Sequence, residues 1–194
     1  IENFPEDHVE ELEAVNHPGD PAAGTRTLRF GREIFVERDD FMENPSNKFF
    51  RLAVGREVRL RYAYLVTCRE VVKDADGTVV ELRCTYDPAS RGGNAPDGRK
   101  VKATLHWVSA RDALPAEVRL YSTLFNRPDP GAGGDLDADL NPASLEVLSD
   151  ALLEPALAES PEGEAVQFER LGYFCPDLAS RSKALVFNRT IDLR

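Results

Sequence analysis

Two pairs of basic side chains stand two residues apart in segments where apolar and polar residues alternate. Arg59 and Arg61 form one pair, and Lys100 and Lys102 form the other. Successive side chains of a β-strand point to opposite faces, so the members of each pair are expected on one face. A guanidinium group can donate bidentately to a phosphate or to the edge of a base. The pairs therefore favour contact with a nucleic acid, although a solvent-facing strand would carry the same residues.

Aromatic residues are interleaved with these cations. Phe49 and Phe50 precede Arg51, and Tyr62 and Tyr64 follow the arginine pair. Single-stranded RNA is typically held by bases that splay against arginines and aromatic rings. The pattern favours RNA binding, and a twisted barrel with a polar outer face stays open as the alternative.

The charges are segregated along an acidic chain. The 194 residues have a net charge of -10, yet residues 45–124 carry 14 Lys or Arg against nine Asp or Glu, a net charge of +5. Residues 1–44 have a net charge of -8 and residues 125–194 one of -7. Salt screens charges over about 8–10 Å, so the local sign matters more to an anionic partner than the total does. Unless the clustering is chance, the middle segment is the part that meets RNA.

Groups for catalysis or metal binding are scarce. The three histidines, His8, His17 and His106, stand in no nucleophile motif, and neither a G-x-S-x-G elbow nor a Gly-rich phosphate motif occurs. "RGGNAPDGRK" is interpreted as a plain loop. The acidic stretch from Asp135 has Leu140 where a calcium loop needs Gly at its sixth position. We therefore predict no catalytic residue, metal or cofactor in this chain.

Cysteine spacing and hydropathy bear on the compartment. The three cysteines are an odd number and lie far apart, which argues against a disulfide framework and favours a reducing compartment. No apolar run approaches the roughly 18 residues of a membrane-spanning helix. We expect a cytoplasmic protein without membrane contact, and we expect a fragment because the sequence does not begin with Met.

Alternation and turn residues predict an all-β chain. Residues 57–73 are expected as one strand, with Val58, Leu60 and two tyrosines on one face and the arginine pair with Ala63 and Leu65 on the other. A turn rich in Asp and Gly should follow it. The other expected strands lie within residues 25–41, 79–87, 100–110, 115–125 and 183–193 and in a pair centred on Val166, Phe168 and Tyr173. Residues 127–147 are expected as a long connection with one short helical turn.

Several blocks of the sequence match one family in order and with compatible spacing. They include "VRLRYAYLV", "DGRKVKATLHWVSA", "NPASLEVL", "QFERLGYFCPD" and "LVFNRTIDLR". Together they resemble the C-terminal anticodon-binding region of bacterial-type glutaminyl-tRNA synthetases, over essentially the whole chain. Glutamyl enzymes of the archaeal and eukaryotic type share this architecture and are the alternative parent.

The resemblance implies two small antiparallel β-barrels. A distal barrel of residues 45–124 would be inserted into a proximal barrel built from residues 1–44 and 125–194. The inserted part coincides with the basic segment.

The resemblance also implies which residues read the anticodon. Arg59 and Arg61 correspond to two family arginines that face the first anticodon base. Gln167 and Arg170, in "QFER", correspond to residues that hold the middle base.

The contact with the third base departs from the family pattern. The family has a Lys-Arg pair where this chain has Phe50-Arg51, so Arg51 is kept and the lysine is replaced. Lys48 lies close enough in sequence to substitute for it. Lys48, Lys100 and Lys102 are candidates for contact with the RNA backbone.

The family implies a parent enzyme that attaches glutamine to tRNA with ATP and Mg²⁺ in a nucleotide-binding domain. The signature motifs of that domain do not occur here, so we expect the chain alone to be inactive. The implied partners are the tRNA for glutamine and the parent's own catalytic domain, in a monomer. A stand-alone RNA-binding β-barrel module is the alternative.

Overall fold

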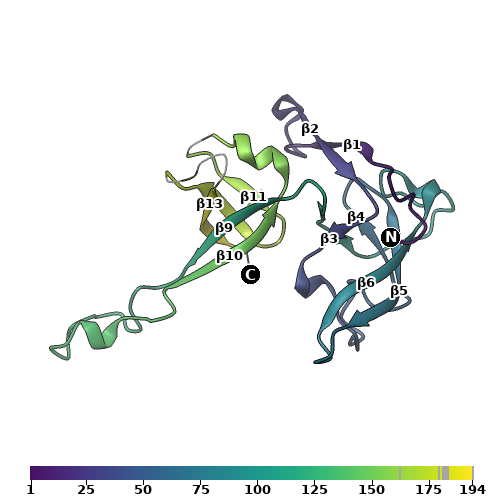
Figure 1. Ribbon diagram of the computed structural model, residues 1–194. Helices are drawn as coiled ribbons and strands as arrows, with labels where there is room; N and C mark the ends of the chain where they lie inside the picture. Colours follow the sequence, from purple (N-terminus) through teal and green to yellow (C-terminus); the bar gives the residue numbers. More distant parts are fainter. Residues whose placement is uncertain (162, 179, 181–183, 194) are drawn as a thin grey trace. The chain divides into compact units, whose positions relative to one another are not determined.

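The computed structural model describes residues 1–161, 163–178, 180 and 184–193 (Figure 1). These residues form β-strands and short 3-10 helices, of which the longest is Pro155–Glu159. The predicted all-β class is therefore confirmed. Contacts divide the chain into unit 1, Ile1–Ala113, and unit 2, Leu114–Arg194. No helix in the described part of the chain is long and apolar enough to cross a membrane.

Unit 1 is built from three antiparallel or mixed sheets. One pairs β1 with β2, one pairs β3 with β8, and the third has the order β6-β5-β4-β7. The strands are β1 (Glu10–Val15), β2 (Thr25–Phe30), β3 (Ile34–Phe35), β4 (Glu57–Leu60), β5 (Leu65–Lys73), β6 (Val79–Tyr86), β7 (Thr104–Leu105) and β8 (Val108–Ser109).

A single core joins the sheets of unit 1. The ring of Phe30 lies 5.0 Å from that of Phe4, 5.3 Å from that of Tyr64 and 5.2 Å from that of Trp107, measured between centroids. All four side chains are buried. The first 44 residues thus share one core with the segment that follows them.

The predicted strand over residues 57–73 is wrong, because a tight turn divides it. β4 ends at Leu60, whose amide donates to the carbonyl of Tyr64 at 2.8 Å, and β5 begins at Leu65. Tyr62 has a φ of 63°, an uncommon conformation for a residue other than glycine. Because β5 folds back antiparallel beside β4, Ala63 and Leu65 are buried rather than outward-facing.

The alternation expected over residues 100–110 is confirmed, although the strand is not continuous. Ala103, Leu105 and Trp107 are buried, whereas Lys100 and Lys102 are exposed. Only the short strands β7 and β8 form hydrogen-bonded ladders here, to β4 and β3.

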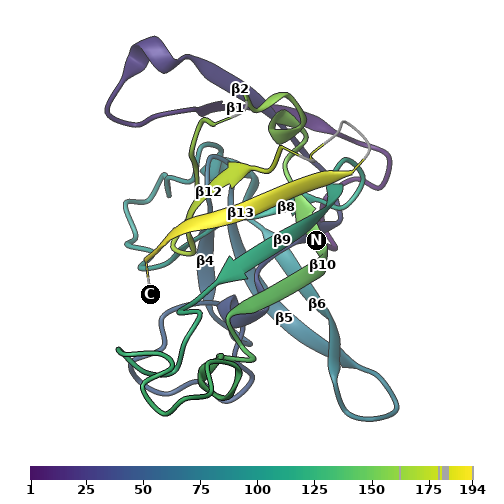
Figure 2. The ribbon, with the colours of Figure 1, turned by 90° about the vertical axis from the view of Figure 1, so that its left-hand side faces the viewer.

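Unit 2 is one five-stranded sheet with the order β10-β9-β13-β12-β11 (Figure 2). β13 runs parallel to β9, and the other neighbours are antiparallel. Phe187 is fully buried on this sheet, near Phe168, which stacks on Phe174 with centroids 4.2 Å apart. The strands are β9 (Leu114–Tyr121), β10 (Leu145–Leu153), β11 (Val166–Phe168), β12 (Gly172–Pro176) and β13 (Leu185–Asp192).

A long loop joins β9 to β10 at the far end of their hairpin (Figure 1). It contains the short 3-10 helix Asp137–Asp139, as the sequence predicts, while its last predicted residues already belong to β10. Asp139 is buried, accepts a hydrogen bond from the amide of Gly131 and pairs with Arg127. The acidic stretch from Asp135 therefore forms a loop that is held by its own hydrogen bond and ion pair.

The predicted strand pair around Val166, Phe168 and Tyr173 is confirmed as β11 and β12. The last predicted strand is confirmed as β13, although its first residue, Lys183, lies outside the described residues. The described strands form four hydrogen-bonded sheets. Closure into two barrels, and the insertion of residues 45–124 into a barrel of 1–44 and 125–194, stay predictions.

Replacement of Phe187 by alanine tests the core of unit 2. Because the side chain is fully buried, Phe187→Ala should lower the free energy of unfolding by about 3–5 kcal/mol. Ile191→Ala, on the exposed end of the same strand, should change it by less than about 0.5 kcal/mol. Denaturant unfolding followed by circular dichroism measures both, and equal losses would contradict this view of the core.

Candidate nucleic-acid interface

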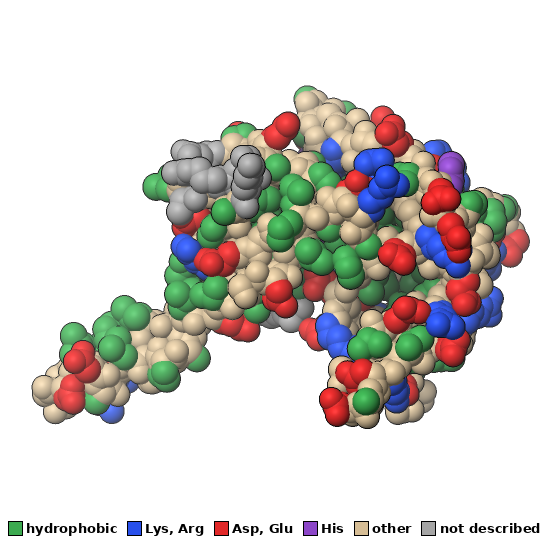
Figure 3. All heavy atoms as spheres, viewed as in Figure 1, with side chains coloured by type: hydrophobic (Ala, Val, Ile, Leu, Met, Phe, Trp, Pro, Cys, Tyr) green, Lys and Arg blue, Asp and Glu red, His purple; other side chains and the backbone are tan. Residues whose placement is uncertain are grey.

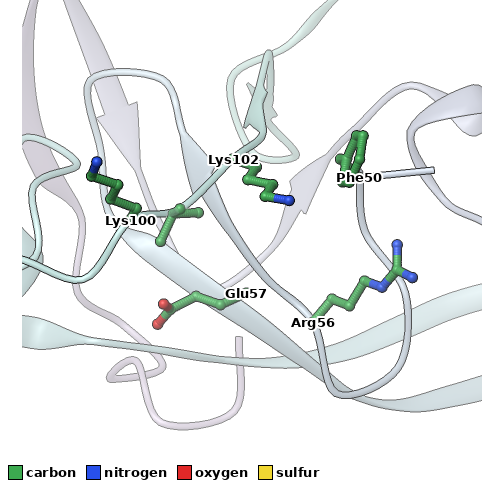
Figure 4. Close-up of a pocket in the computed structure, with 6 residues that line it drawn as sticks. Phe50, Arg56, Glu57, Lys100 and Lys102 are labelled. Atoms are coloured by element: carbon green, nitrogen blue, oxygen red, sulfur yellow. The ribbon is translucent and has the colours of Figure 1, made fainter. Parts of the chain in front are cut away.

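A shallow hollow on unit 1 is lined by two of the predicted cations, Lys100 and Lys102. Its volume is about 280 Å³. In Figure 4, Lys102 reaches toward Phe50, whereas the ammonium group of Lys100 points away from that ring. The Nζ atom of Lys102 lies 4.5 Å from the centroid of the Phe50 ring. The hollow is lined by Phe50, Arg56, Glu57, Lys100, Val101 and Lys102.

Arg59 stands on β4, two residues after Glu57, which lines this hollow. Its register partner on β7 is Thr104, whose hydroxyl accepts from Nη1 of Arg59 at 3.4 Å. The Nε atom of Arg59 donates to the carbonyl oxygen of Gly93. The guanidinium group is therefore tethered at two atoms by acceptors from two different segments.

Gly93 belongs to the loop that the sequence indicated as a plain one. Gly92 and Gly93 have φ values of 82° and 85°, which favour glycine. A Cβ atom on Gly93 would lie 2.7 Å from Cδ of Arg59. The segment does form a loop, as predicted, but its role in orienting Arg59 was not predicted from the sequence. The Gly-Gly pair was the available signal, since glycine permits close approach of a side chain to the backbone.

Arg99 fixes the far end of this loop. Its guanidinium group donates to Glu57 at 2.8 and 2.9 Å, to Asp87 at 2.6 Å and to Asp97 at 3.0 Å. These hydrogen bonds raise the pKa of Arg99. The hydrogen bond from Arg99 to Asp87, together with the one from the amide of Ala89, lowers the pKa of Asp87. Residues 87, 97 and 99 are thereby tied to β4 through Glu57.

Glu10 and Ser90 fix the near end. Nε of Arg91 lies 2.5 Å from one carboxylate oxygen of Glu10, and the hydroxyl of Tyr64 donates to the other at 2.5 Å. Burial raises the pKa of Glu10, but these two hydrogen bonds outweigh it, so the net pKa is lowered. The buried Ser90 hydroxyl accepts from the amide of Leu65 at 2.9 Å. Both ends of the loop are thus anchored to strands.

Arg61 lies in the turn after β4 rather than on the same strand as Arg59. Its amide donates to the carbonyl of Leu105 at 3.0 Å, and its own carbonyl accepts from Nε1 of Trp107 at 2.9 Å. The guanidinium carbon lies 5.8 Å from the centroid of the Tyr62 ring. The structure therefore keeps the two predicted arginines in one region, but by a turn and not by strand periodicity.

Arg51 forms an ion pair with the buried carboxylate of Asp40. Its Nη1 atom lies 3.2 Å from Oδ1 of Asp40, whose side chain is 1% exposed, and it also donates to the carbonyl of Asp39 at 3.2 Å. Any contact with a base would therefore extend from a guanidinium group that also neutralises a buried charge. Lys48 is exposed nearby in sequence. The role of both in reading the third base stays a prediction.

Gln167 and Arg170 lie together on unit 2. Gln167 is exposed on β11 opposite Tyr173 of β12, and Arg170 sits in the turn between these strands with a φ of 65°. The amide of Leu171 closes the turn by donating to Phe168 at 2.9 Å. One hairpin thus carries the two residues predicted to hold the middle base.

The surface of unit 1 is mixed in charge rather than uniformly basic. Its 113 residues carry 17 Lys or Arg and 20 Asp or Glu, because the acidic N-terminal segment packs into the same unit. Figure 3 shows the two signs interleaved on one face. Several arginines, including Arg29, Arg83, Arg91 and Arg99, are paired with carboxylates. Local placement of cations therefore decides where an anion could bind.

Among the described residues, no group of three or more His, Cys, Asp or Glu is arranged to hold a metal ion.

Comparison with known proteins assigns the family. Residues 1–87 and residues 104–177 each match a family model described as the anticodon-binding domain of class I tRNA synthetases for E and Q. The chain belongs to this family. The anticodon-binding domains that it resembles form the part of these synthetases that meets the anticodon, and the predicted family resemblance is confirmed.

Similar curated proteins carry the name glutamine–tRNA ligase. The chain is 67% identical to the one from Nitrobacter hamburgensis over 194 residues, 50% identical to the one from Vibrio campbellii over 195 residues and 49% identical to the one from Clostridium kluyveri over 197 residues. Each match covers the whole of this chain. The chain spans about a third of the length of these relatives, between 34% and 35%.

Removal of the Tyr64 hydroxyl tests the anchoring of Glu10. Because the folded-state pKa of Glu10 is lowered, its stabilisation is present above its unfolded pKa and is lost as the pH falls through the folded one. Tyr64→Phe should therefore cost about 1.5 kcal/mol of stability at pH 7. The loss should shrink at pH values below the ordinary pKa of a glutamate. In Tyr121→Phe, which loses a bond to the neutral Asn188, the loss should not depend on acid pH. A pH-independent loss in Tyr64→Phe would contradict the anchoring.

Two alanine replacements test the close approach of Arg59 to Gly93. Both Gly92→Ala and Gly93→Ala force alanine into an unfavourable positive φ, but only a Cβ atom at residue 93 would contact the Arg59 side chain. Gly93→Ala should therefore be more destabilising, by about 1 kcal/mol or more, in thermal unfolding. In the Arg59→Ala background the difference between the two variants should vanish. A difference that persists there would contradict the approach.

Proposed function

We propose that this chain recognises the anticodon loop of the tRNA that accepts glutamine, as the C-terminal part of a glutamine–tRNA ligase. The observation that carries the proposal is that relatives with this name match the chain over its whole length at 49–67% identity. The family also includes the E-type synthetases, so an anticodon-binding part of a glutamyl-type enzyme is the second candidate.

The chemistry of the candidate interface suits an unstacked anticodon. Arg59 and Arg61 are proposed to read the first base, Gln167 and Arg170 the middle base and Arg51 the third. Arginine offers donors to acceptor edges, and the amide of glutamine can both donate and accept. A base that fits wrongly leaves a polar group unpaired, which costs about 1–3 kcal/mol or roughly 5- to 150-fold in affinity.

The tether on Arg59 defines how it could read a base. Nε and Nη1 already donate to Gly93 and Thr104, so Nη2 is the guanidinium nitrogen without a protein acceptor among the described residues. A fixed donor pays little conformational entropy when the base arrives. Lys100 and Lys102 are proposed to add contacts with phosphates.

The remaining steps of the parent reaction are assigned outside this chain. ATP and Mg²⁺ are proposed to act in a catalytic domain of the parent, so the chain by itself should not attach glutamine to tRNA. We propose that the parent works as a monomer in the cytoplasm. Its partners would be the tRNA and, within the same polypeptide, the catalytic domain.

Titration with tRNA variants tests this function. The chain should bind a tRNA with a glutamine anticodon at least about 5-fold more tightly than the same tRNA with a substituted first anticodon base. Arg59→Ala should weaken binding and abolish that preference, whereas Gln167→Ala should reduce discrimination at the middle base. Arg83→Ala, an exposed arginine paired with Glu81 on β6, is the matched control and should change neither.

Fluorescence anisotropy at fixed ionic strength provides the measurement, because phosphate contacts make all affinities depend on salt. Equal affinity for every anticodon would contradict the proposal. Preference for a glutamate anticodon would instead support the second candidate.

A further inference from the structure

One exposed aromatic side chain of unit 1 is left without a role by the proposed anticodon contacts. Phe50 is 50% exposed and lies in the hollow of unit 1, where the family resemblance places a lysine. A single exposed aromatic ring is ordinary on a protein surface. This one, however, lines a hollow together with the cations Arg56, Lys100 and Lys102, as Figure 4 shows.

We propose that this hollow is a stacking subsite for one unpaired nucleotide of the bound RNA, with its base against the ring of Phe50 and its phosphate beside Lys102 and Arg56. The proposal rests on the proposed RNA-binding function and deepens it. It assigns to Phe50 a contribution to affinity that is independent of base identity.

The charge of the hollow favours an anion. Arg56, Lys100 and Lys102 line it, and Glu57 is the one carboxylate among the lining residues. Both oxygens of Glu57 accept from Arg99, at 2.8 and 2.9 Å, but Arg99 is shared with Asp87 and Asp97, so the charge of Glu57 is only partly offset. The three lining cations outnumber this one carboxylate, and Arg56 and Lys102 lie on the Phe50 side of the hollow, where the phosphate is proposed to bind.

The geometry favours a flat ring. Nζ of Lys102 lies over one face of the Phe50 ring, 4.5 Å from its centroid, so the base is proposed to stack on the other face, with this cation within reach of its phosphate. Nη1 of Arg56 donates to the carbonyl of Phe49, which fixes the guanidinium group next to the same ring. A volume of about 280 Å³ lies at the small end of ligand sites, where a single nucleotide fits and a folded duplex does not.

The chemistry of the walls predicts tolerance for any base. A ring stacks on the π-face that every base has, whereas the walls present no neutral amide that could read a base edge. Stacking on one aromatic side chain typically contributes about 5- to 150-fold to affinity. The replacement of a family lysine by Phe50 would thus exchange a charge contact for a stacking contact.

Variants at Phe50 test the subsite. Phe50→Ala should weaken binding of the glutamine-anticodon tRNA and of the anticodon-substituted tRNA alike, by about 10-fold. Phe50→Trp should keep the affinity, and its added indole fluorescence should be quenched as the RNA saturates the chain. Phe35→Ala, which removes a ring of similar exposure, 47%, on β3 of the same unit, is the matched control and should leave affinity unchanged. The melting temperature of each variant shows that it is folded.

A short single-stranded oligouridine should also quench Phe50→Trp, and an RNA duplex of the same length should not. Unchanged affinity in Phe50→Ala, or no quenching in Phe50→Trp, would overturn the subsite. If Phe50→Ala weakens every RNA while the chain shows no anticodon preference, the subsite stands and the proposed anticodon specificity fails. If the preference is present and Phe50→Ala has no effect, the specificity stands and the subsite fails.

Discussion

The hydrogen bond from Arg59 to the carbonyl of Gly93 is the contact on which the candidate interface depends. It needs a backbone that approaches a side chain more closely than a Cβ would allow, and Gly93 provides that. The loop can hold this position because Arg99 and Arg91 pin its two ends to Glu57 and Glu10. The ion pairs at the two ends of the loop thus determine the direction in which Arg59, the side chain proposed to read a base, points.

This arrangement separates two contributions to binding. Tethered or paired arginines cost little entropy to order, so they suit discrimination between bases, in which a wrong partner leaves a donor unpaired. The hollow with Phe50 and Lys102 suits affinity, because stacking and phosphate attraction do not depend on base identity. A protein with a net charge of -10 can hold an anionic partner in this way, since a few cations are placed where the RNA is proposed to lie.

Much of the fold could be predicted from the sequence, and the failures have physical causes. Alternation correctly indicated an all-β chain and the inward positions Val58 and Leu60. The turn at Tyr62 was not predicted, because tyrosine rarely adopts a positive φ and is not a typical turn residue. The contact of Gly93 with Arg59 was not predicted, because the two residues lie 34 positions apart in the sequence. The ion pair of Arg51 with Asp40 could not be predicted from sequence spacing either. The alternation of apolar and polar residues thus predicts strands, whereas contacts between residues far apart in sequence determine how their side chains are oriented.

Photo-crosslinking most directly tests the central claim that the tethered Arg59 faces the first anticodon base. A glutamine tRNA with thiouridine at that position would be irradiated in complex with the chain, and the linked peptide would be identified by mass spectrometry. The account predicts crosslinks within residues 57–61 or 93–104, the segments that carry Arg59 and the acceptors of its guanidinium group, and their loss in Gly93→Ala. Crosslinks confined to other segments of the chain would contradict it.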